Sequence, residues 1–135
     1  MSFEQSLQDR WAADAELAAL IAPDRVFTGH PAETAPPRAV IAVLAARPLW
    51  LASGGVRWEE RRVRITVEDE DYGRAAAVGD RMTAVFHRAA WEAEPALAVV
   101  RCVCLRRGPT VARSASLWRQ TSDWSALLRI ADEEP

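Results

Sequence analysis

VRWEERRVRITVEDED (residues 56–71) runs directly into DYGRAAAVGDRMTAVFHRAAW (residues 71–91), and this junction decides the fold. In the first stretch Val63, Ile65 and Val67 alternate with polar residues, which is typical of a strand with one buried face. In the second stretch apolar residues recur at spacings of three and four and form one helical stripe from Tyr72 to Ala89. We therefore predict a one-faced strand that packs against a one-striped helix.

The N-terminal third predicts helix followed by an extended connector. Ser2 is a suitable N-cap for a first helix, and Asp14 is a suitable cap for a second, short helical turn. Residues 23–38 contain four prolines, so we expect them to lie extended along the surface. Val26 and Phe27 are the residues expected to hold this connector against the domain.

Three more apolar runs predict strands, at residues 39–46, 96–107 and 123–130. The first run is apolar on both faces, which predicts a strand covered on both sides. In the long strand Trp58 and Val63 cannot share a face of a regular strand, so we predict a bulge near residues 59–61. Residues 47–55 and 108–121 are predicted to be loops.

These elements give the order α-β-β-α-β-β. We predict an α+β fold, with an antiparallel sheet of about four strands and two helices packed on one face. A chain of 135 residues is expected to form a single domain over residues 1–135.

Composition narrows the range of partners. The net charge is −2 and all 17 positive residues are arginines, so a general basic surface for nucleic acid is not expected. No apolar stretch approaches the roughly 20 residues that span a bilayer. The N-terminus lacks a signal peptide's apolar segment, so we expect a soluble protein made inside the cell. Cys102 and Cys104 are interpreted as small buried hydrophobic residues.

Motifs of catalysis and cofactor binding are not found in the sequence. It has no glycine-rich phosphate loop, no nucleophile elbow and no zinc-binding histidine pair. The two histidines, His30 in the connector and His87 on the long helix, have no partners at spacings that would form a catalytic set. We therefore expect neither an enzyme nor a bound cofactor.

An acidic run, residues 68–71, precedes the long helix. Carboxylates at a helix N-terminus offset the macrodipole, and Asp71 is a suitable N-cap, so this interpretation is favoured over a metal site. The spacing lacks the glycine and the distal glutamate of a calcium loop. As a third interpretation, Glu68, Asp69 and Glu70 line a channel wall and repel DNA phosphates.

Six tryptophans are more than the core of so small a domain needs. Trp11 and Trp124 fall on predicted core faces, whereas Trp50 and Trp118 fall in predicted loops beside arginines. Tryptophan and arginine dominate the energetics of protein interfaces. The candidate interface residues are Trp50, Leu51, Trp58, Arg61, Arg106, Arg107, Arg113, Leu117, Trp118 and Arg119.

The order of these patterns resembles the small phage tail-completion, or tail-terminator, proteins. Those proteins open with a short helix, an aspartate-led second turn and a step of Arg, an aliphatic residue and an aromatic residue, followed by a proline-rich connector. The segments that carry the resemblance are DAEL (14–17), DRVF (24–27), PPRAVI (36–41), VRITV (63–67) and LLRI (127–130).

The resemblance implies a structural subunit of a phage tail, a tail-like particle or a gene-transfer agent, assembled in the bacterial cytoplasm. Six copies would form a ring that ends the tail tube and docks it to the head. The implied partners are the chain itself, the tail tube protein and a head–tail connector protein, with DNA passing through the ring. Residues 39–67 and 108–121 are the expected suppliers of the contacts between copies.

Two alternatives stay open at the level of sequence. One is a head-side neck or connector protein, and the other is a small α+β ligand-binding domain unrelated to tails. A concave pocket with converging polar groups and shifted pKa values would favour the second.

Overall fold

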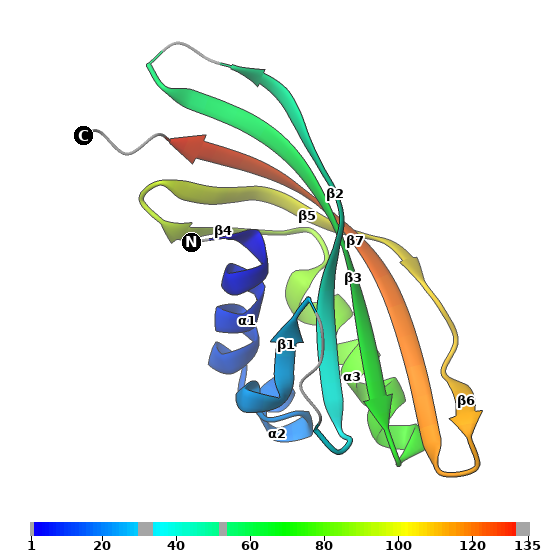
Figure 1. Ribbon diagram of the computed structural model, residues 1–135. Helices are drawn as coiled ribbons and strands as arrows, with labels where there is room; N and C mark the ends of the chain where they lie inside the picture. Colours follow the sequence, from blue (N-terminus) through cyan, green and yellow to red (C-terminus); the bar gives the residue numbers. More distant parts are fainter. Residues whose placement is uncertain (1, 30–33, 52–53, 132–135) are drawn as a thin grey trace.

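The computed structural model describes residues 2–29, 34–51 and 54–131 and is dominated by long strands (Figure 1). Its helices are α1 (Phe3–Ala13), α2 (Ala15–Leu20) and α3 (Tyr72–Phe86), with a 3₁₀ turn at Pro23–Arg25. Its strands are β1 (Val26–Thr28), β2 (Arg38–Leu51), β3 (Val56–Asp69), β4 (Ala89–Glu94), β5 (Leu97–Arg107), β6 (Val111–Ser114) and β7 (Leu117–Ala131).

The sheet is larger and more mixed than predicted. Its strand order is β1-β2-β3-β7-β5-β4, with β6 paired to β7. The pairing of β1 with β2 is parallel, and the other described pairings are antiparallel. The prediction of a four-stranded antiparallel sheet with two helices is therefore wrong: seven strands curl into a half-barrel, and three helices lie within the curl (Figure 1).

Two strands that were not predicted from the sequence, β4 and β6, explain much of this difference. The predicted helix continued to residue 91, but α3 ends at Phe86 because Arg88 takes a left-handed conformation, with a φ of 62°. The chain then reverses into β4. The predicted loop at 108–121 is instead β6 and the first part of β7. The buried positions there are the polar Gln120 and Ser122, which hide the alternation.

The connector and the predicted bulge also differ from expectation. Residues 23–28 are not simply extended, because they form the 3₁₀ turn and β1, where Val26 is buried and Phe27 is half-buried. His30 lies outside the described residues. The bulge does not lie at residues 59–61, since β3 pairs with β7 without a register shift. The shifts lie in β2, and Trp58 simply faces the opposite side from Val63.

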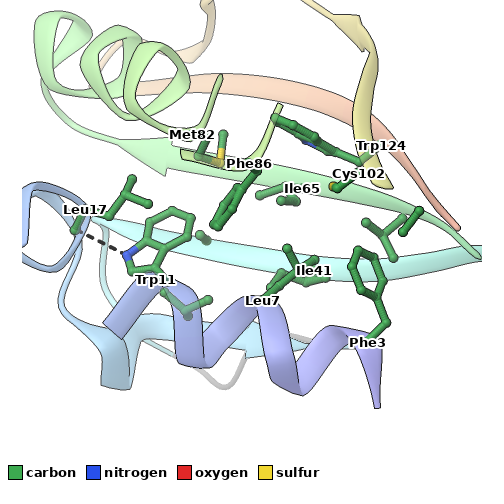
Figure 2. Packing of buried hydrophobic residues seen from close by; sticks show 14 of the residues in the cluster. Phe3, Leu7, Trp11, Leu17, Ile41, Ile65, Met82, Phe86, Cys102 and Trp124 are labelled. Atoms are coloured by element: carbon green, nitrogen blue, oxygen red, sulfur yellow. Dashed lines mark hydrogen bonds between the residues drawn. The ribbon is translucent and has the colours of Figure 1, made fainter. Parts of the chain in front are cut away.

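The core lies between the helices and the inner face of the sheet (Figure 2). The predicted alternation in β3 is confirmed, because Val63, Ile65 and Val67 are buried. The stripe of α3 is confirmed only in part, since Tyr72 is 53% exposed. Other buried side chains of the core include those of α1 (Phe3, Leu7, Trp11), α2 (Leu17), α3 (Val78, Met82, Phe86), β2 (Ile41), β5 (Cys102) and β7 (Trp124).

Trp11 ties α1 to the turn that follows. Its indole Nε1 donates to the carbonyl oxygens of Leu17, at 3.2 Å, and Ile21, at 3.0 Å. A buried indole N–H requires such acceptors, so these bonds fix the path of α2 across the end of α1. The predicted core positions of Trp11 and Trp124 are confirmed.

The hairpin of β2 and β3 extends past this core. We define the arm as residues 43–51 of β2 and 56–62 of β3. Val43 and Leu44 are each 47% exposed, so the prediction that residues 39–46 are covered on both sides is wrong beyond Ile41. Figure 1 shows the arm continuing beyond the helices at the upper end of the sheet.

Candidate assembly surfaces

The predicted interface residues fall largely into two groups at opposite ends of the long strands. Trp50, Leu51 and Trp58 lie in the arm, whereas Leu117 and Trp118 lie where β7 begins. Trp118 pairs with Asp69, which is the last residue of β3. Trp58 is close to Val56, which is the first residue of β3. A strand advances about 3.3 Å per residue, so roughly 40 Å of strand separates the two groups.

The arm group is built by direct cross-strand pairing. Trp50 pairs with Trp58, and their rings stack with centroids 5.6 Å apart and planes at 26°. Trp58 also faces Arg129 across the β3–β7 ladder, and Arg129 is exposed. We define the arm patch as Trp50, Trp58, Arg47 and Arg129, which register places on the outer face of the sheet. The side chain of Leu51 lies outside the described part of the chain.

Trp50 remains 55% exposed in spite of this stacking. Arg47 is 66% exposed and makes one long contact, 3.5 Å, with Glu60. Large exposed aromatic residues beside arginines are typical of interface hot spots. The arm patch therefore has the composition of a docking surface.

The second group surrounds the start of α3. Trp118 is half-buried against Tyr72, with ring centroids 5.0 Å apart in an edge-on arrangement of 76°. In the β6–β7 hairpin Trp118 pairs with Ala112, and Arg113 is exposed next in sequence. Val111, which is exposed and pairs with Arg119, and Leu117, which is half-buried, lie on the opposite face of the same hairpin. We define the hairpin patch as Tyr72, Val111, Arg113, Leu117 and Trp118.

Several predicted surface residues are engaged within the chain instead. Arg61 binds Glu4 at 2.9 Å and Glu59 at 2.7 Å, and its side chain is 21% exposed. These bonds tie the base of the arm to the first turn of α1. Arg61 therefore positions the arm, and little of it is available to a partner.

Two residues of the acidic run, Glu68 and Asp69, form ion pairs with arginines of the same chain. Glu68 lies between Arg38, at 3.0 Å, and Arg119, at 3.2 Å, on the outer face of the sheet. Asp69 is fully buried and binds Arg74 in a bidentate pair. Asp71 caps α3 by accepting from the backbone N–H of Arg74 at 2.9 Å, as predicted, and Glu70 is exposed.

The arginines at the end of β5 differ from each other. Arg107 binds Asp80 of α3 at 2.7 Å, which ties β5 to the helix. Arg106 is exposed and lies beside Arg64 and Asp123 in a small depression of about 190 Å³. Arg64 and Asp123 form a bidentate pair across the β3–β7 ladder.

Sequence reasoning missed a groove between α2 and α3. Its volume is about 570 Å³, and its lining residues are apolar (Ala19, Leu20, Ala77, Ala84) and charged (Glu16, Asp80, Arg81). Glu16 and Asp80 are 70% and 73% exposed. The repeated alanines of both helices were the available signal, but only the fold brings them together.

The two cysteines lie in and beside the core, with Cys102 buried and Cys104 half-buried. Burial raises the pKa of the Cys102 thiol to about 12, so the thiol stays protonated at neutral pH. Cys102 and Cys104 are both free. Within residues 2–29, 34–51 and 54–131, no group of three potential metal ligands is found. None of the helices in those ranges is long and apolar enough to cross a membrane.

Comparison with protein families gives a match over residues 5–129, to the family described as "Tail completion protein gp17". The chain belongs to this family. It is therefore a structural protein of a phage or phage-like tail. The resemblance inferred from the sequence is confirmed.

The fold of this tail-completion family member is also similar to a solved chain from the "Virion of native gene transfer agent (GTA) particle". The TM-score is 0.65 at 15% identity, and the match covers 95% of this chain and 95% of that chain. At that identity the likeness concerns the fold. No curated protein shows significant sequence similarity to the chain.

Proposed function

We propose that six copies of this chain form a closed ring that ends the tail tube and offers a docking face to the head. The family membership supports a tail role. The observation that carries the ring is the presence of two exposed aromatic patches at opposite ends of β3. A contact between unlike surfaces of identical subunits generates a ring when its rotation closes.

In this proposal the protein acts by shape and makes or breaks no bond. The contacts with other copies, the tube protein and a connector protein come from the arm patch and the hairpin patch, together with Leu51, Arg106 and Arg107. Arg61 and Arg119 hold the patches in place from within the chain. Glu70, with Glu68 and Asp69 behind it, faces the channel through which DNA passes.

The whole chain is proposed to act as one domain, assembled in the bacterial cytoplasm into a phage tail or a gene-transfer agent. One hydrophobic cluster joins α1, α3 and the long strands, which supports a single folding unit. Within that unit the arm is the segment least covered by its own core. It is therefore suited to contacts outside the subunit.

Electron microscopy of the purified chain mixed with its tail tube protein tests the proposal. We expect rings at one end of each tube and shorter tubes as the ratio of this chain to tube protein rises. A protein that stays monomeric and never associates with tube ends would refute it. Binding to a portal ring but not to tubes would place the protein on the head side instead.

A variant of the hairpin patch tests that surface in the same assay. Trp118→Ala should reduce the fraction of capped tubes, because Trp118 contributes the largest side chain of that patch. Leu105→Ala is the control, since Leu105 is also exposed (49%) but lies on β5 opposite the middle of β7, away from both patches. Unchanged far-UV circular dichroism would show that both variants fold. Unchanged capping by Trp118→Ala would remove Trp118 from the interface.

A further inference from the structure

The arm patch carries large aromatic side chains, whereas small alanines make up much of the lining of the α2–α3 groove. Trp50 stacks on Trp58 and keeps more than half of its surface exposed. The groove has a volume of about 570 Å³ and is largely open to solvent, so a side chain of another molecule can reach it.

We propose that the arm patch of one copy inserts into the α2–α3 groove of the next copy in the ring. This inference rests on the proposed function and names the contact that builds the ring. Trp50 would contact Ala77, Ala84 and Leu20. Full burial of an aromatic side chain covers about 150–250 Å². Trp50 is 55% exposed, so docking would remove roughly half of that area from water and would make Trp50 the main apolar contact.

The charges around the two surfaces favour this pairing. The arm patch carries Arg47 and Arg129, and the groove carries Glu16 and Asp80 against one arginine, Arg81, which is itself paired with Asp14. Glu16 is held only by one long contact, 3.4 Å, with Arg81, so it is available to an incoming arginine. Asp80 already binds Arg107 at 2.7 Å and contributes less. Exposed pairs add little affinity but select the orientation of docking.

The geometry excludes docking of an arm into the groove of its own subunit. Figure 1 shows the arm at the upper end of the sheet and α2 at the lower end. The arm of each copy must therefore enter a different copy. Two copies could exchange arms reciprocally as a two-fold dimer, whereas in the proposed ring the contact repeats in one direction and its rotation closes.

One variant on each surface tests the contact. Trp50→Ala removes the inserted side chain, and Ala84→Arg fills the groove while keeping a good helix former. We expect each to raise the concentration for half-assembly on the order of 10- to 100-fold, measured by light scattering after size exclusion. Leu105→Ala, an exposed apolar residue (49%) outside both surfaces, is the control and should assemble as wild type. If Trp50→Ala misfolds, Arg129→Glu provides a second arm variant.

Mixing the two variants tests the direction of the contact. A mixture of Trp50→Ala and Ala84→Arg has one intact arm and one intact groove, on different chains. We expect a heterodimer in native mass spectrometry and no ring. Homodimers of either variant would show that the contact joins like surfaces and would overturn the proposal.

Other outcomes separate this inference from the proposed function. Rings that form normally from both variants would overturn the arm–groove contact and leave the ring itself established. Rings that persist but no longer bind tube ends would assign the arm to the tube protein, and would also overturn the contact. If the wild type forms no ring even with tube protein, the contact and the proposed function both fail.

Discussion

Gly79 in α3 permits a close approach to β7. A Cβ atom at Gly79 would overlap the side-chain amide of Gln120, which is buried (2% exposed). The Nε2 of Gln120 donates to Thr110 Oγ1 at 3.4 Å, so the amide is held over the helix. Glycine costs about 1 kcal/mol of helix stability relative to alanine. That cost is accepted here because the helix and strand pack without a side chain between them.

Gly79→Ala should therefore destabilise the protein by about 1–3 kcal/mol, the usual cost of overpacking, in spite of its better helix propensity. In a Gln120→Ala background the same change should be neutral or stabilising by up to about 1 kcal/mol, because the overlap is gone. Urea unfolding of the four proteins in a double-mutant cycle measures this difference. An equal cost in both backgrounds would contradict the packing argument.

Asp14 performs two tasks between α1 and α3. Its Oδ2 accepts from the backbone N–H of Leu17, at 3.0 Å, and caps α2. Both carboxylate oxygens also accept from Arg81, at 2.7 and 2.9 Å. The hydrogen bonds from Arg81 lower the pKa of Asp14 to about 2. Folding therefore favours the ionised carboxylate.

This lowered pKa predicts a defined loss of stability in acid. The contribution of Asp14 is complete above its ordinary pKa of 3.8 and is lost as the pH falls toward 2. Asp14→Asn keeps a good N-cap but loses the ion pair, so this variant should be less stable than the wild type at pH 7. Its free energy of unfolding should also change less with pH between pH 4 and pH 2. Denaturant unfolding across that range measures both effects.

Arg81→Met tests the same ion pair by removing the arginine that binds Asp14. It should flatten the acid profile as Asp14→Asn does, and the double variant should show no further flattening. If the free energy of unfolding of either single variant falls with decreasing pH as steeply as that of the wild type, other carboxylates dominate acid unfolding.

At the scale of elements, the sequence predicted β3 and α3 because their patterns are strong and local. Val63, Ile65 and Val67 alternate without interruption, and α3 has both a cap and a stripe. β4 was missed because AAWEAE continues a helical composition, and only the left-handed Arg88 ends the helix. β1 was missed because three residues are too short a run to show a period.

The residue types of the proposed assembly surfaces can be recognised in the sequence, but their exposure cannot. Trp50 and Trp118 stood out as tryptophans beside arginines, and both lie at the surface or partly exposed. Arg61 has the same composition around it but binds Glu4, 57 positions away, which no local pattern reveals. The α2–α3 groove joins residues that are about 60 positions apart, so its existence depends on the tertiary fold.

The arm and the central sheet should differ in amide hydrogen exchange. Residues 63–67 of β3 lie between β2 and β7 under the helices and should exchange slowest. Residues 43–50 of β2 are flanked by β3 alone in the described chain and are largely exposed, so they should exchange much faster in the monomer. Mass spectrometry of peptides from the two regions measures the ratio of their amide exchange rates. Equal protection would contradict a separately exposed arm.

In the proposed ring, unlike surfaces of neighbouring copies of the whole subunit meet. A curled sheet with its helices inside leaves one patch at each end of the long strands, and an uncovered arm on one side. A two-fold dimer could exchange these contacts reciprocally, whereas a ring repeats one contact in a single direction. In the proposed ring each copy places its arm on one neighbour and receives the arm of the other neighbour in its groove.

Native mass spectrometry of the wild-type protein over a range of concentrations tests this claim most directly. We expect a single closed oligomer at six times the chain mass, alone or on addition of tube protein, that does not grow as concentration rises. A dimer as the largest species, or a ladder that lengthens without limit, would contradict the account.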